Sequence, residues 1–129
     1  MFDGRTGEFV LKRQKGGVGY FGQVRVRVVA GVEPVVWQVD PADSSSLQPG
    51  TDHELVAAAL AGVADGLRLV AEAGVDVTGW SAEVVHVQLN FTDIEESAVR
   101  AAGALAVGDA FEVGMEPVFD GGWTARLAG

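Results

Sequence analysis

The sequence has no cysteine, only four prolines and few aromatic residues, which make up 8% of the chain. Without cysteine the chain cannot form disulfides, thiolate metal sites or a cysteine nucleophile. The two histidines, His53 and His86, lie far apart in the sequence and do not make a zinc-binding pattern. These absences predict a domain that uses no metal and no other cofactor.

Uninterrupted hydrophobic runs are also missing. Charged residues break up the start of the chain, which leaves no apolar segment for a secretory signal. The most apolar long stretch, residues 55–75, contains Asp65, Arg68 and Glu72, and such charges are costly at the centre of a bilayer. We therefore expect no membrane contact and a cytoplasmic location.

Basic residues are scarce and unevenly placed. The net charge is −9, yet residues 1–30 hold six basic and two acidic residues, whereas the rest of the chain holds three basic and sixteen acidic residues. A local basic ribbon can meet phosphate even in an acidic protein, although a charged run often only keeps a surface solvated. The candidate binding cations are Lys12, Arg13, Lys15, Arg25 and Arg27.

The length and the pattern of apolar residues predict one domain, residues 1–129, with an α+β fold. Alternation predicts strands over 7–13, 20–30, 33–40 and 83–91, and helical spacing predicts helices over 51–74 and 93–111. Residues 115–129 predict a short exit strand and a loose tail. The order βββαβα predicts a two-layer sandwich in which two helices cover one face of a four-stranded sheet.

The turns and faces of the strands follow from the same patterns. Two antiparallel hairpins are expected, one turning at 16–19 and one turning at Gly31. In the last strand, the alternate residues Val85, Val87, Leu89 and Phe91 are expected on the apolar face.

Two capping boxes predict where the helices begin. Thr51 with Glu54 precedes the first helix, and Thr92 with Glu95 precedes the second. The acidic run 93–96 could hold a metal or a general acid, but we interpret it as charge that complements the helix dipole.

The glycine run near the start raises a different possibility, because Gly17, Gly19 and Gly22 have the spacing of a dinucleotide-binding fingerprint. That fingerprint works where the glycines lead into a helix, whose free N–H groups hold the pyrophosphate. Here they lead into residues 23–29, which alternate as a strand does. The glycines therefore predict a hairpin tip, with Gly22 at a bulge or at a close approach of another backbone, and no nucleotide cofactor.

No assembled catalytic set is visible. Asp43 precedes three serines, but no positioned base accompanies them, and His86 is expected to line the open face of the sheet beside Gln88. A deep pocket that gathered His86 with an acid would favour an enzyme. Without one, we expect a protein that is not an enzyme.

The stretch LKRQKGGVGYFGQVRVRV, residues 11–28, resembles the opening of domain IV of the translocation factor EF-G and of related ribosomal-protection factors. The likeness continues to residue 119 through a Pro-Gly step into the first helix and through the strand and helix that follow. The resemblance implies a fold like that of ribosomal protein S5 domain 2. It also implies a stand-alone version of the domain, since a GTPase domain does not fit in this length.

In the family, two tip loops of this domain enter the ribosomal decoding centre. The resemblance places the first tip at Gly16, Gly17, Val18 and Gly19, and the second at Asn90, Thr92 and Asp93. The family usually has a basic residue where this chain has Val18, and the second loop here is shorter and lacks a histidine often found there.

These observations lead to two functional hypotheses. The first is a non-catalytic domain that contacts ribosomal RNA or a translation-related partner through its basic first hairpin. The alternative is a protein-interaction or self-association module of the same fold, which binds another protein or a second copy through a sheet face or an open edge strand.

Overall fold

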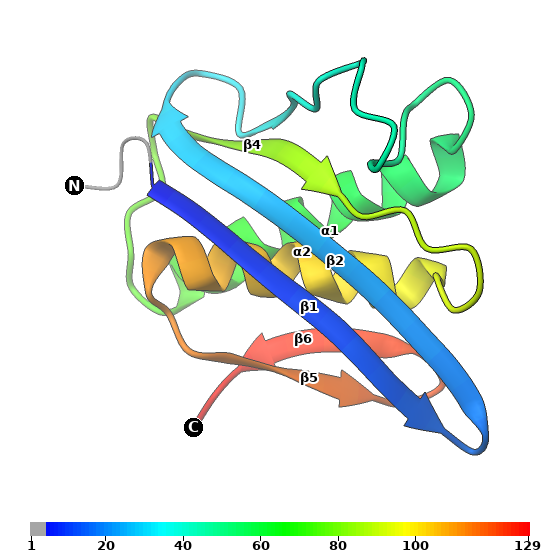
Figure 1. The fold of residues 1–129 in the computed structure, drawn as a ribbon. Coiled ribbons are helices and arrows are strands. Elements are labelled where there is room, and N and C mark those ends of the chain that lie inside the picture. Colours follow the sequence, from blue (N-terminus) through cyan, green and yellow to red (C-terminus); the bar gives the residue numbers. More distant parts are fainter. Residues whose placement is uncertain (1–4) are drawn as a thin grey trace.

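The structure of the protein is a computed structural model, which describes residues 5–129 (Figure 1). Six strands and two helices follow one another in this part of the chain. They are β1 (Arg5–Lys15), β2 (Val18–Ala30), β3 (Val35–Trp37), α1 (His53–Glu72), β4 (Trp80–Val87), α2 (Glu96–Phe111), β5 (Met115–Phe119) and β6 (Trp123–Leu127).

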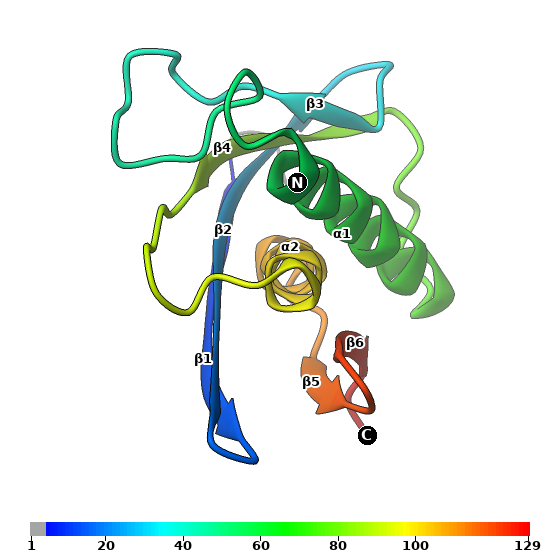
Figure 2. The same cartoon turned by 90° about the vertical axis from the view of Figure 1, so that its right-hand side faces the viewer.

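The elements form an α+β two-layer sandwich, as the sequence predicted. Four strands make one sheet in the order β1-β2-β4-β3, and both helices lie on the same face of it (Figure 2). Helix α2 covers the β1–β2 hairpin, and α1 lies beside α2 under β3 and β4. The opposite face of the sheet carries the polar side chains of β2.

The β1–β2 hairpin is the longest element of the sheet. Its strands are paired from Arg5 with Val28 to Lys15 with Val18, which leaves a two-residue turn at Gly16–Gly17. Both turn glycines have positive φ, of 58° and 80°, as a tight hairpin turn requires. The early glycines thus lead into a strand, which confirms the predicted hairpin.

The second predicted hairpin, at Gly31, is wrong. After β2 the chain crosses the start of β4, and β3 then pairs in parallel with β4, with Val35 opposite Ala82. The strand is also only three residues long, whereas 33–40 was expected. Alternation along a segment indicates that a strand forms, but it does not identify the neighbouring strand. Here β4 takes the place beside β2.

Glycines bring α2 close to the hairpin. A Cβ on Gly7 of β1 would overlap the carbonyl oxygen of Ala106, and one on Gly22 of β2 would overlap that of Ala98. Gly22 therefore marks a close approach of another backbone, one of the two roles predicted for it. The same contact buries the alternating valines of β2, Val24, Val26 and Val28, and each buried valine contributes about 1.5–3 kcal/mol.

A bulge in β4 changes the faces that alternation predicts. Arg25 pairs with His86 and Val26 pairs with Val84, so Val85 is the extra residue on β4. As a result Val84 and Val87 are both fully buried, whereas Val85 is only half-buried. The expectation that Val85 and Val87 both lie on the apolar face is therefore wrong.

The chain leaves the sheet after the bulged strand, and the prediction for Phe91 fails there. β4 ends at Val87, so Phe91 lies in the following loop and 91% of it is exposed. Once the strand has ended, its alternation no longer decides which way a side chain points.

Both predicted capping boxes are wrong. The N-cap of α1 is Asp52, and no side chain caps this helix, since the Thr51 hydroxyl donates to the Asp52 carboxylate instead. Helix α2 begins at Glu96, and its N-cap is Glu95, whose carboxylate accepts from the amides of Ser97 and Ala98. The acidic run before α2 therefore serves the helix N-terminus, as expected.

The C-terminal segment is ordered, which corrects the predicted loose tail. β5 and β6 form an antiparallel hairpin that packs on α2, with Phe119 paired with Trp123. Trp123 is 5% exposed, and this burial holds the hairpin against the helical layer. Among residues 5–129 there is no helix long and apolar enough to cross a membrane.

Candidate docking surface on the β1–β2 hairpin

The distal half of the β1–β2 hairpin extends beyond the end of α2, and its turn is the far end of the molecule in Figure 2. Lys12, Arg13 and Lys15 are all exposed here. Lys12 lies opposite Phe21 on the open face of the sheet, whereas Arg13 lies opposite Tyr20 on the other face. The hairpin therefore carries positive charge on both of its faces.

None of the three cations is held by a carboxylate within residues 5–129. The Arg13 guanidinium donates to the backbone carbonyl of Lys12 at 3.3 Å, and the Lys15 ammonium lies 5.8 Å from the centre of the Trp123 ring. Trp123 is 5% exposed, but the Lys15 ammonium is exposed to solvent, and a cation–π contact with a solvated cation gains only about 0.5–1 kcal/mol. The positive charge of this segment is therefore available to a partner.

The other two predicted cations are placed differently. Arg27 makes two hydrogen bonds to Glu83 of β4, at 3.0 and 2.7 Å, and Arg25 lies 3.2 Å from the carboxylate of Glu8 on β1. Both pairs lie on the open face of the sheet near the middle of β2, away from the turn. These ion pairs neutralise the arginines, which the structure does not join with Lys12, Arg13 and Lys15.

An aromatic cluster packs against the inner face of the hairpin. The Tyr20 ring lies 5.4 Å from the ring of Phe119 and 6.1 Å from that of Trp123, so the C-terminal hairpin supports the distal half of β2. This contact could not be predicted from the sequence, because no pattern near Tyr20 indicates a partner a hundred residues away. The one signal in the sequence is Trp123, a large aromatic residue in a glycine-rich segment.

The second predicted tip loop lies against the first hairpin. The amide of Phe21 donates to the carbonyl of Asp93 at 2.8 Å, and a Cβ on Gly19 would meet the Asp93 carboxylate at 2.7 Å. Gly19 is thus a strand residue next to this loop and not part of the turn. The Asn90 side chain accepts hydrogen bonds from the amides of Thr92 and Asp93, so it shapes its own loop.

Val18, paired with Lys15 beside the turn, is 52% exposed. Phe91, in the second loop, is 91% exposed. Val18 therefore places one exposed apolar group beside the Lys15 cation.

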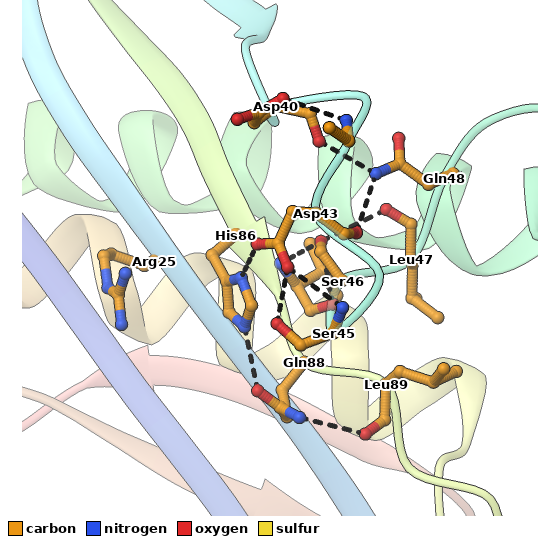
Figure 3. A network of polar contacts seen from close by, with 12 residues as sticks. Arg25, Asp40, Asp43, Ser45, Ser46, Leu47, Gln48, His86, Gln88 and Leu89 are labelled. Carbon is orange, nitrogen blue, oxygen red and sulfur yellow. Dashed lines mark hydrogen bonds and ion pairs between the residues drawn. The ribbon is translucent and has the colours of Figure 1, made fainter.

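A network of polar contacts lies further along the open face (Figure 3). His86 is 8% exposed, with Nδ1 at 3.1 Å from the Asp43 carboxylate and Nε2 at 2.8 Å from the side-chain oxygen of Gln88. Ser45 donates its hydroxyl to Asp43 at 2.6 Å. The structure thus joins His86 with an acid, yet both ring nitrogens are engaged and the serine bonds to the acid. This network fixes the loop 41–48 on the sheet.

The hydrogen bonds to Asp43 also affect its acidity. The hydroxyl and the amide of Ser45, together with His86, stabilise the carboxylate and lower the pKa of Asp43 below its ordinary value. A low pKa suits an acceptor that must stay charged to hold its loop.

A cavity of about 470 Å³ lies in the helical layer, between the two helices and the β5–β6 turn. At its rim Asp65 accepts two hydrogen bonds from Arg100 and lies 3.8 Å from Arg68, so the charges there neutralise one another. Within the described range no group of three or more potential metal ligands forms.

Comparisons with known proteins establish the fold of this chain. No family model and no curated protein matches the sequence. Among solved structures, a crystal structure of a protein from Thermus thermophilus is similar to this chain, with a TM-score of 0.67 and 24% identity. The alignment covers 88% of this chain but 17% of that one, so the chain spans a small part of its neighbour's length. At this identity the likeness establishes the fold alone.

Proposed function

We propose that the protein is a non-catalytic, cytoplasmic docking domain that contacts RNA of the translation apparatus through the distal half of the β1–β2 hairpin. One observation carries the proposal. Three unpaired cations, Lys12, Arg13 and Lys15, lie together on a protruding hairpin, whereas the arginines nearer its base are neutralised. Unpaired surface cations are the groups that neutralise phosphates when a protein binds nucleic acid.

The resemblance of residues 11–28 to domain IV of EF-G supports RNA as the partner. The second loop lies beside β2 at Gly19 and Phe21, and not at the Gly16–Gly17 turn. Asp93 faces the hairpin at Gly19 and weakens the positive field there. We therefore expect contacts through the Lys12 to Val18 end of the hairpin and not through the second loop.

The test is binding to purified ribosomes and to a single-stranded RNA, measured by co-sedimentation and fluorescence anisotropy at several salt concentrations. The variant Lys12→Gln with Lys15→Gln should weaken binding and flatten its salt dependence by a slope of about 1–2 on a log–log scale. The matched control, Arg68→Gln with Arg126→Gln, removes two cations elsewhere and should leave the salt slope unchanged. Equal effects of both double variants, or no binding at low salt, would contradict the proposal.

A second candidate function is that of a protein-interaction module. It is favoured by the outer edge of β1, an outer strand of the sheet.

A further inference from the structure

The outer edge of β1 has a regular pattern of backbone groups. Lys15 and Val18 flank the two-residue turn, so the odd residues of β1 bond to β2. The even residues point their N–H and C=O groups away from the sheet. The contact of the Glu8 amide with α2 confirms this direction, because its N–H donates to the Asp109 carboxylate at 3.0 Å.

The outer edge of β1 is covered by another side chain near the start of the strand and is uncovered further along. Asp109 covers the strand at Glu8, so the edge cannot be extended there. Beyond it, the outward amides of Val10, Lys12 and Gln14 have no hydrogen-bond partner anywhere in residues 5–129. Three outward-facing residues in a row make a short template for another strand.

The side chains of the open segment indicate which kind of strand would bind there. Val10 is 46% exposed, Lys12 follows it on the same face, and Arg13 and Lys15 lie on the other face. No acidic residue occurs from residue 9 to residue 23. A strand added here would place its side chains opposite cations on both faces, with an apolar position opposite Val10.

We propose that the edge of β1 from Val10 to Gln14 binds an extended acidic segment of another protein as an added β-strand. Backbone hydrogen bonds to the outward amides supply the register, and carboxylates opposite Lys12 and Arg13 supply selectivity. This interaction goes beyond the RNA contact and does not depend on it, since it uses the side of the hairpin and its backbone.

A second copy of the chain does not fit this edge. Two β1 edges side by side would bring Lys12, Arg13 and Lys15 of both copies together, and like charges on paired strands are destabilising. A register that set Glu8 opposite Lys12 of the second copy would relieve the repulsion. The Asp109 side chain blocks that register, because it already occupies the edge at Glu8.

The test uses a capped peptide, acetyl-Glu-Thr-Glu-Glu-Val-Val-Thr-amide, added to isotope-labelled full-length protein and followed by NMR. We expect the amide signals of Val10, Lys12 and Gln14 to shift and to exchange more slowly with solvent. The same peptide with glutamine in place of glutamate should bind at least about tenfold more weakly. Equal binding of the two peptides, or shifts confined to side-chain signals, would overturn the proposal.

Proline substitution tests the backbone edge of β1 without changing the charge of the hairpin. Val10→Pro removes an outward N–H without removing a hydrogen bond of the β1–β2 ladder, and it keeps all three cations. It should abolish peptide binding and leave RNA binding unchanged, whereas the control Val10→Thr should keep both. Gln14→Pro provides a second variant at another outward amide. Undiminished peptide binding by the folded proline variants would refute strand addition, and loss of RNA binding with retained peptide binding would reverse the two assignments.

Discussion

Gly22 of β2 and Ala98 of α2 are in direct backbone contact, with no room for a methyl group between the strand and the helix carbonyl. This contact, repeated by Gly7 and Ala106 at the other end of the hairpin, lets α2 lie flat on two strands. The long hairpin is therefore rigid where it is covered, and its charged end is positioned by the helix.

Replacing Gly22 with alanine should destabilise the protein by roughly 1–3 kcal/mol or more, because a Cβ would overlap the backbone of α2 and force the layers apart. Urea denaturation measures the loss. Gly50→Ala is the matched control, since nothing lies within 4 Å of its added Cβ, and it should change the free energy of unfolding little. Similar costs for both would show that the layers are not in this contact.

Replacing Glu95 with alanine should cost about 1 kcal/mol, because its carboxylate accepts from two amides at the start of α2. The neighbouring Glu96→Ala removes the same charge from the first turn without removing the cap. The difference between the two variants, measured by thermal or urea unfolding, isolates the cap. If Thr92→Ala proved more costly than Glu95→Ala, the cap would be misassigned.

Asp43 should make stability depend on pH in acid. Its pKa is lower in the folded chain than in the unfolded chain, so its contribution is present at neutral pH and is lost as the pH falls through the folded pKa. Asp43→Asn should therefore be less stable than the parent at pH 7, and the difference should shrink below about pH 3.8. Asp120→Asn, at an exposed turn, serves as the control. A difference that stayed constant down to low pH would contradict the role of the charge.

Phe91 and Phe111 test the boundary between surface and core. Phe91→Ala should change the free energy of unfolding by no more than about 0.5 kcal/mol, because the ring is exposed. Phe111→Ala, at the end of α2, should cost roughly 3–5 kcal/mol, since that ring is 3% exposed. A large loss for Phe91→Ala would mean that its ring is covered in solution.

The element types and the first hairpin could be predicted because they depend on local patterns. The alternation of Val24, Val26 and Val28 and the adjacent turn glycines describe nearby backbone, and both predictions held. Pairing of distant strands depends on competition between segments. For that reason the position of β3, next to β4 and parallel to it, could not be obtained from its own residues.

The candidate site likewise has some features that local sequence indicates and others that depend on the pairing of distant strands. Exposure of Lys12, Arg13 and Lys15 follows from their place at the end of a hairpin, which the sequence indicates. Neutralisation of Arg25 and Arg27 depends on the register that sets Glu8 and Glu83 opposite them. The bulge at Val85 lies between these pairs, and no residue type in β4 announces it.

The cover of the first hairpin comes from the second half of the chain, and this has a consequence for biosynthesis. β1 and β2 are made first, yet α2, which buries their valines, ends at Phe111. A nascent chain therefore carries an uncovered apolar ribbon until α2 has left the ribosome. We expect truncated chains that end before α2 to aggregate or to recruit chaperones, and the domain to fold only after α2 has been made.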